Sequence, residues 1–339
     1  MTIRRFILFL LVFPAVIARA QAPQQWISLG DFPLESGAQI LNARQGYRRY
    51  GSADLTARPV VVVPTWFGGH SADLAALTGP DNLLDTTRFT FLVLDALGNG
   101  VSSSPSTSSD QPAAAFPRFT IGDMVRAQYQ ALTRGLQLHH VYAILGGSMG
   151  GMQVFQWVVD YPGFMDKAVS YVGVPWLSAH SRLVLEAELA AIRAGQEAAL
   201  PDSIIANEVA LIQVLNAYTP AYRNRRTRRD SVPDFIRAYE QRFRQRFRLW
   251  DWTRQVQAML VHDVTRPYGH DLEATLSRVR APCLIIVSRQ DHLVTPEPAR
   301  EWARSAGATL VEFDNDCGHL APGCEKERFV RVVNQFLRQ

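Results

Sequence analysis

Short apolar runs rich in β-branched residues alternate with amphipathic stretches along most of the chain. Val141–Leu145 is a nearly continuous apolar run, which is typical of a strand buried on both faces of a parallel sheet. The pattern therefore predicts an α/β fold with a mostly parallel central sheet flanked by helices. Predicted strands cover residues 58–64, 89–94, 141–145, 167–172, 283–287 and 308–313, with antiparallel strands in 36–50 at one edge, and predicted helices cover 121–136, 152–161 and 297–306.

One region, residues 175–277, departs from this alternation because its pattern is helical throughout, with predicted helices over 182–199, 203–217 and 231–250. In the last of these an aromatic residue recurs at every fourth position, which places one aromatic stripe along a helix face. Such a stripe indicates packing within the region or a subunit interface more readily than a ligand cage. A helical insertion between two strands predicts a lid over the site. The stripe consists of Phe235, Tyr239, Phe243 and Phe247.

The first residues have the pattern of a secretory signal peptide. Arg4 and Arg5 precede the apolar run Phe6–Ile17, and Ala18-Arg19-Ala20 provides small residues for cleavage. The twelve-residue run is shorter than the roughly 20 residues of a spanning helix, so an uncleaved anchor is the less favoured alternative. We expect a periplasmic or secreted protein with no membrane span after processing. The predicted organisation is a signal peptide (1–20), a hydrolase-type core in two parts (21–174 and 278–339) and the lid (175–277).

The charge balance changes once this segment is removed. The whole chain has 35 Lys and Arg against 31 Asp and Glu, and loss of three N-terminal arginines lowers the formal net charge from +4 to +1. A nearly neutral protein gives no reason to expect a nucleic-acid partner. The arginine-rich run over 223–229 is then predicted to be a solvated loop, with attraction of an anionic substrate or surface as the alternative.

Three cysteines follow the predicted cleavage site. Cys283 lies in an apolar run and is expected to be a buried free thiol. Cys317 and Cys324 flank a short loop containing glycine and proline, and in an oxidising compartment these two are expected to form a disulfide. Unpaired thiols or another pairing are the alternatives.

The candidate chemistry begins at Ser148, which lies in the G-x-S-x-G pattern formed by Gly146 and Gly150. An apolar strand precedes this pattern and a helical pattern follows it. A sharp strand-to-helix turn of this kind exposes the serine Oγ above the sheet as a nucleophile for acyl transfer. A glycine-rich structural turn is the alternative, whereas a dinucleotide loop is excluded because Ser148 replaces the central glycine of G-x-G-x-x-G.

A nucleophilic serine needs a histidine base and an acid that orients it. In the serine, acid, histidine order of α/β-hydrolases, both partners follow later strands. Asp291 follows the strand predicted over 283–287, and His319 follows the strand predicted over 308–313. Asp316 is the alternative acid.

The oxyanion produced by such a serine requires two backbone N–H donors. Met149, directly after Ser148, is expected to provide one donor. Trp66, in the glycine-rich loop after the strand predicted over 58–64, is expected to provide the other, with Thr65 as the alternative. Neither a metal-binding motif nor a nucleotide-cofactor motif occurs in the sequence, so no metal and no tightly bound cofactor are expected.

With these residues assigned, the chain resembles the homoserine O-acetyltransferase family of α/β-hydrolase-fold enzymes. The resemblance rests on the long run Gly146-Gly-Ser-Met-Gly-Gly-Met-Gln153 and on shorter matches elsewhere. It implies an acyl-enzyme on Ser148, with Asp291 and His319 completing the triad. The shorter matches are Leu34-Glu-Ser-Gly37, Phe119-Thr-Ile-Gly-Asp-Met-Val-Arg-Ala-Gln128, Tyr161-Pro162, Asp291 and Gly318-His319.

The sequence departs from this family directly after the candidate base. Family members typically have an aspartate there that helps hold the amino group of homoserine, whereas this chain has Leu320. Acetyl-CoA is also not an expected donor outside the cytoplasm. We therefore expect a serine hydrolase acting on small carboxylic esters, with an O-acyltransferase and a non-catalytic binding protein as alternatives. The resemblance and the aromatic stripe together favour a homodimer formed through the lid.

Overall fold

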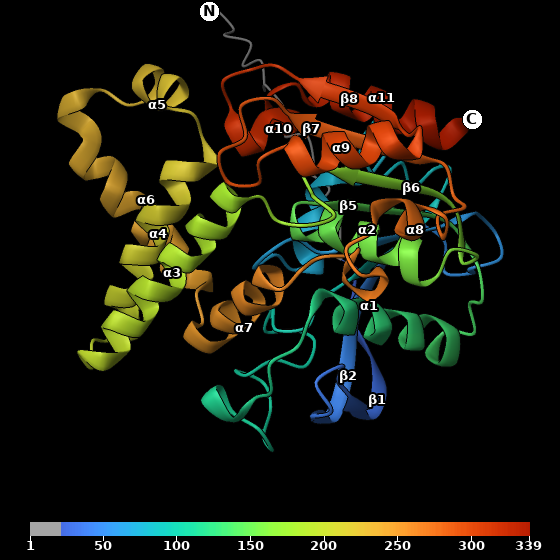
Figure 1. Cartoon of the computed structure of the whole chain (residues 1–339), viewed down its shortest axis with the longest axis horizontal. Helices are drawn as coiled ribbons and strands as arrows, with labels where there is room; N and C mark the ends of the chain where they lie inside the picture. The colour runs from blue at the N-terminus through green and yellow to red at the C-terminus, as the bar shows by residue number, and fades with distance from the viewer. Residues whose placement is uncertain (1–21) are drawn as a thin grey trace, which may run out of the picture.

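The computed structural model describes residues 22–339, in which eight strands form a single sheet (Figure 1). The predicted signal peptide, residues 1–20, lies outside the described residues. The order across the sheet is β1-β2-β4-β3-β5-β6-β7-β8. The β1–β2 and β2–β4 pairs are antiparallel, and every other pair in the sheet is parallel. The strands are β1 (Gln25–Pro33), β2 (Gln39–Tyr50), β3 (Val60–Pro64), β4 (Thr90–Leu94), β5 (Val141–Gly147), β6 (Met165–Tyr171), β7 (Cys283–Ser288) and β8 (Thr309–Phe313).

Amphipathic helices cover both faces of this sheet and confirm the α/β-hydrolase fold class expected from the sequence. One apolar cluster unites the sheet with α1 (Ile121–Gln130), α2 (Met149–Asp160) and α9 (Glu297–Ala306). A second cluster on the opposite face includes α11 (Lys326–Arg338). Each fully buried large apolar side chain contributes roughly 1.5–3 kcal/mol to folding. The short helices α8 (Leu272–Leu276) and α10 (Ala321–Cys324) complete the core.

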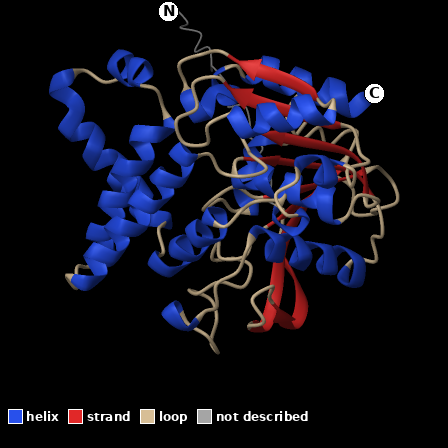
Figure 2. Ribbon diagram, in the orientation of Figure 1, coloured by secondary structure: helices blue, strands red, loops and turns tan. Residues whose placement is uncertain are grey.

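The helical insertion lies between β6 and β7, and α3 to α6 stand together beside the sheet (Figures 1 and 2). The prediction of a single helix over 231–250 is wrong. Phe247 is extended (ψ 127°), which ends one helix and allows a second helix to begin at Leu249. Because the chain turns there, the ring of Phe247 packs 5.7 Å from that of Trp252. The helices are α3 (Ala179–Glu197), α4 (Asp202–Ala217), α5 (Pro220–Arg226), α6 (Val232–Arg246) and α7 (Leu249–Leu260).

The aromatic stripe of α6 packs largely within the insertion itself. The ring of Phe243 lies 4.9 Å from that of Trp252, and the guanidinium of Arg223 lies 4.0 Å from the ring centre of Phe235. This arrangement agrees with packing within the region. Among the described residues, none of the helices is long and apolar enough to cross a membrane.

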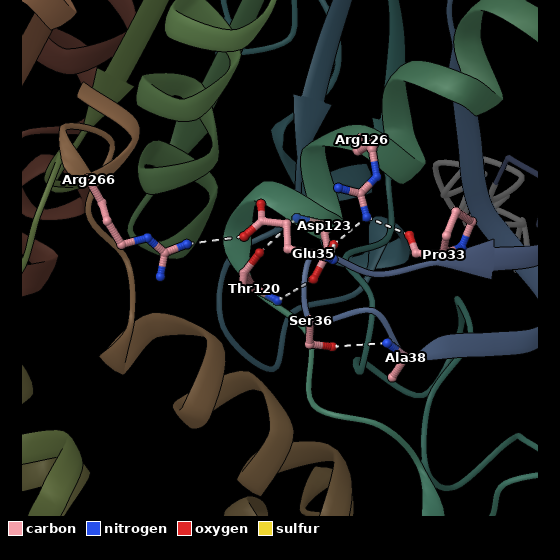
Figure 3. Close-up of polar contacts among 8 residues, drawn as sticks. All are labelled: Pro33, Glu35, Ser36, Ala38, Thr120, Asp123, Arg126 and Arg266. Carbon is pink, nitrogen blue, oxygen red and sulfur yellow. Dashed lines mark hydrogen bonds and ion pairs between the residues drawn. The ribbon is translucent and has the colours of Figure 1, made fainter. Parts of the chain in front are cut away.

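Two stretches that carry the family resemblance meet where the edge hairpin joins α1 (Figure 3). The carboxylate of Asp123 accepts the backbone N–H of Glu35 at 2.9 Å and that of Thr120 at 3.0 Å. The second bond belongs to a capping box that begins α1. Arg266 pairs with Glu35 at 3.1 Å and ties the end of the insertion to the same point. These residues therefore have a structural role in joining three segments of the chain.

Candidate active site

A sharp turn between β5 and α2 presents Ser148. Its backbone has φ 55° and ψ −124°, a conformation that non-glycine residues rarely adopt. A Cβ atom on Gly150 would lie 2.5 Å from the carbonyl oxygen of Pro64, and one on Gly146 would lie 2.2 Å from that of Gly150. Glycine is therefore required on both sides of the serine. The helix begins at Met149, three residues earlier than the sequence predicted, because Gly150 and Gly151 belong to its first turn.

The structure brings Ser148, His319 and Asp291 together in a single hydrogen-bonded chain. The Oγ of Ser148 lies 2.9 Å from Nε2 of His319, and Nδ1 of His319 lies 2.6 Å from Oδ2 of Asp291. Both His319 and Asp291 are buried. This is the geometry in which a histidine can accept the serine proton while the carboxylate fixes its tautomer.

The acid is held from the side opposite the histidine. Oδ1 of Asp291 accepts the backbone N–H groups of Leu293 and Val294, each at 2.9 Å. The alternative acid, Asp316, instead forms a bidentate pair with Arg225 of α5. Of the two acids considered from the sequence, Asp291 is therefore the one that contacts His319.

Two features fix the loop that carries His319. Gly318 has φ 61°, and a Cβ there would lie 2.9 Å from the carbonyl oxygen of Ala217 at the end of α4. Cys317 and Cys324 form a disulfide on either side of the histidine, whereas Cys283 is a buried free thiol. The loop therefore has little freedom to move the imidazole away from Ser148.

Two backbone N–H groups beside Ser148 are free to bind an oxyanion. Met149 is the first residue of α2, so its N–H has no intrahelical acceptor. The N–H of Trp66 donates no hydrogen bond within residues 22–339, whereas that of Thr65 already donates to the carbonyl oxygen of Leu94 at 3.0 Å. Of the two loop residues considered from the sequence, Trp66 is therefore the available donor.

Ser148 and His319 open into a cavity of about 540 Å³. Its wall is mainly apolar and aromatic and comes from the core, the loop after β3 and the insertion. Leu320, directly after His319, contributes an apolar side chain that is 42% exposed. No Asp or Glu side chain lines this cavity within the described part of the chain, and Lys326 is its only Lys or Arg residue.

Several cavity residues were not predicted from the sequence. Tyr171 ends β6 beneath Gly147, and burial raises the pKa of its hydroxyl. Tyr218, Tyr239 and Trp252 reach the cavity from the insertion. The aromatic stripe that includes Tyr239 was a sequence signal, but its spacing did not indicate which ring would face the cavity.

The remaining histidines lie away from this arrangement. His262 is buried, and its pKa falls to about 4 because burial disfavours the charged imidazole. It hydrogen-bonds the carbonyl oxygen of Val174 at 3.0 Å. The ring of His180 hydrogen-bonds the backbone carbonyl oxygen of His292 at 2.9 Å, and neither residue lines the cavity.

Known proteins resemble this chain over nearly its whole length. Residues 58–322 match the model of the alpha/beta hydrolase fold family. An ethyl acetate hydrolase of Pseudomonas veronii is 27% identical, with 80% of this chain and 82% of that protein covered. A homoserine O-acetyltransferase of Clavibacter michiganensis subsp. michiganensis is 28% identical, with 93% and 92% covered.

Solved structures share the same architecture. The acetyl esterase MekB superposes with a TM-score of 0.85 at 23% identity, covering 94% of this chain and 98% of that one. The likeness to homoserine O-acetyltransferases supports the resemblance expected from Gly146–Gln153. The chain belongs to the alpha/beta hydrolase fold family.

Proposed function

We propose that this protein is an exported serine hydrolase that cleaves small carboxylic esters through an acyl-enzyme on Ser148. The observation that carries the proposal is the hydrogen-bonded chain from Ser148 through His319 to Asp291 at the mouth of an apolar cavity. The ethyl acetate hydrolase among its relatives supports the same substrate class.

The reaction proceeds in two halves. Ser148 Oγ attacks the ester carbonyl carbon while His319 Nε2 takes its proton, and the N–H groups of Met149 and Trp66 stabilise the resulting oxyanion. The C–O bond to the alcohol then breaks, and His319 returns the proton to the departing oxygen. Water repeats the sequence on the acyl-enzyme, which releases the carboxylic acid and restores Ser148.

The cavity favours hydrolysis over transfer to homoserine. A homoserine acceptor would bring an ammonium group next to His319, where Leu320 offers no charge and no carboxylate lines the described wall. Leaving an ammonium unpaired in a desolvated site is costly. O-Acyl transfer remains the second candidate because a homoserine O-acetyltransferase is similar over 93% of the chain.

Product analysis separates these activities. Purified protein is incubated with p-nitrophenyl acetate, with and without homoserine, and Ser148→Ala is the matched control. Ser148-dependent release of free acetate, unchanged by homoserine, is the expected result. O-Acetylhomoserine as the main product would establish transfer instead, and full esterase activity in Ser148→Ala would overturn the mechanism.

Export is the second part of the proposal. It is supported by the signal-peptide pattern of residues 1–20 and by the disulfide between Cys317 and Cys324, which persists in oxidising compartments. Fractionation of cells expressing the full chain tests it. We expect the protein outside the cytoplasm with Gln21 as its N-terminus, whereas cytoplasmic protein that retains Met1 would contradict export.

A further inference from the structure

Helix α7 belongs to the insertion between β6 and β7, yet it is bonded directly to loops of the hydrolase core. The carboxylate of Asp251 accepts the backbone N–H of Ser106 at 2.8 Å. The guanidinium of Arg254 donates to the carbonyl oxygens of Phe116 and Ala114, each at 2.8 Å. These bonds anchor the helix to the core, which does not fit a helix that moves as part of an opening lid.

Two side chains of α7 contact the loop that follows β3. Gln255 is fully buried, and its Oε1 accepts the backbone N–H of Gly68 at 2.9 Å while its Nε2 donates to the carbonyl oxygen of Leu97 at 2.9 Å. The ring of Trp252 lies 4.0 Å from that of Phe67. Its indole also lies 3.2 Å from the place where a Cβ of Gly68 would be. Together, Gln255 and Trp252 fix residues 67 and 68, directly after Trp66.

This loop needs an external support. Between β3 and the short helix that begins at Ser71, backbone–backbone bonds join Thr65 to Leu94 and Gly69 to Trp66, and the carbonyl oxygen of Gly69 accepts the side-chain amide of Asn99 at 2.9 Å. Gly68 has φ 63°, and glycine allows many other conformations at that point. Gln255 provides the acceptor for the N–H of Gly68, so its bond favours the observed conformation at that residue.

Trp252 is itself held from the far side. Its indole Nε1 donates to Oε2 of Glu188 on α3 at 2.9 Å. Oε1 of Glu188 lies 2.5 Å from the side-chain amide of Gln213 on α4. Glu188 is completely buried, and burial raises its pKa to about 8, which favours the neutral acid near pH 7. A neutral anchor avoids the large cost of an isolated buried charge.

We propose that Gln255 and Trp252 are positioning residues that hold the loop after β3 (residues 65–70, the oxyanion loop), and with it the N–H of Trp66, in its catalytic conformation. This inference rests on the proposed function, since it assigns a task within that reaction. It makes part of the insertion a fixed support for the oxyanion site. Misplacing a donor by about 1 Å costs up to ~10²-fold in rate, and complete loss of one costs ~10²–10³-fold.

The test compares Gln255→Leu with Gln257→Leu. Gln257 lies on the same helix and contacts Arg254 rather than the oxyanion loop. We expect kcat for p-nitrophenyl acetate to fall about 10- to 100-fold in Gln255→Leu with little change in KM. Gln257→Leu should remain near the wild type. A wild-type kcat in folded Gln255→Leu would overturn the inference.

A second readout does not depend on activity. Hydrogen exchange followed by mass spectrometry reports protection of the peptide that contains residues 65–70. We expect faster exchange there in Gln255→Leu and not in Gln257→Leu, whereas unchanged exchange would refute the positioning role. If the wild type shows no Ser148-dependent turnover, the proposed function fails, and the exchange result still decides whether Gln255 holds the loop.

Trp252→Phe provides a milder variant in case Gln255→Leu fails to fold. It keeps a ring against Phe67 but removes the indole N–H that bonds Glu188. We expect an intermediate loss of kcat, of about 3- to 10-fold, with faster exchange over 65–70. Wild-type values of both would contradict the role assigned to Trp252.

Discussion

Replacing Asp291 by Asn tests the assignment of the acid with almost no change in shape. In the structure Oδ1 accepts two backbone N–H groups, from Leu293 and Val294, and Oδ2 faces Nδ1 of His319. The asparagine oxygen would keep the first two bonds. Its amide nitrogen would then face the histidine, which must present an unprotonated Nδ1 and carry its proton on Nε2. That tautomer cannot accept the proton of Ser148.

The structure also indicates why the amide should not simply rotate. Rotation would direct the NH₂ group at the two backbone N–H groups and leave both donors without an acceptor. Each buried donor left unsatisfied costs about 1–3 kcal/mol, so the rotated form is disfavoured by roughly 2–6 kcal/mol. We therefore expect kcat to fall ~10⁴-fold, or about 5.5 kcal/mol in activation free energy, while the melting temperature changes little.

The assay is steady-state hydrolysis of p-nitrophenyl acetate, with thermal unfolding measured on the same samples. Asp316→Asn is the matched control because Asp316 pairs with Arg225 and does not contact His319. We expect the control to retain nearly full activity. A loss below tenfold in folded Asp291→Asn, or an equal loss in Asp316→Asn, would refute the assignment.

Three further predictions concern the turn, the disulfide and the buried acid. Gly150→Ala places a Cβ 2.5 Å from the carbonyl oxygen of Pro64, so urea unfolding should show a loss of about 1–3 kcal/mol in the free energy of unfolding, and kcat should fall. Gly163→Ala is the control, because no atom lies within 4 Å of its Cβ, and it should change stability little. Equal effects of the two substitutions would contradict the role of the turn. Reduction of the Cys317–Cys324 disulfide should lower activity before the protein unfolds, and it should cost about 2 kcal/mol in stability. Full activity in a protein with three titratable thiols would rule out a role of the disulfide in holding His319. Glu188, which faces Gln213, Trp252 and Tyr239, has its pKa raised from 4.5 to about 8, so the folded state retains a proton that the unfolded chain releases. Its contribution to the free energy of unfolding is therefore fully present below about pH 4.5 and is lost as the pH rises to about 8, by ~1.4 kcal/mol per pH unit. Glu188→Gln should flatten this dependence of stability on pH in unfolding measurements.

The local sequence pattern was sufficient to predict the central strands and the turn at Ser148. The apolar runs that became β3, β4, β5 and β7 are buried along nearly their whole length, so their composition alone distinguishes them from loops. Among the elements that were not predicted are β1 and α11. β1 is mostly exposed and lies at the sheet edge, so its apolar signal is weak. The helix α11 was missed although Phe329, Val330, Val333, Phe336 and Leu337 have clear helical spacing.

The residues that hold the candidate site in place could not be predicted from local sequence patterns. Gln255 bonds Gly68 across 187 positions of sequence, and nothing in the neighbourhood of either residue indicates the partner. The same holds for Trp252 and Glu188, which meet only after α3 and α7 have packed. Ser148, Asp291 and His319 could be proposed from their order because each follows a recognisable strand. Their mutual distances, and the choice of Asp291 over Asp316, required the folded chain.

The central claim is that Ser148 carries the acyl group during turnover. The most direct test mixes the purified protein with p-nitrophenyl acetate, quenches the mixture in acid at early times, and maps the peptide containing residues 141–153 by mass spectrometry. We expect one acetyl group on Ser148, transient in the wild type, more persistent in Asp291→Asn and missing in Ser148→Ala. Rapid turnover by a wild-type enzyme whose Ser148 is never acylated, matched by undiminished turnover in Ser148→Ala, would contradict the account.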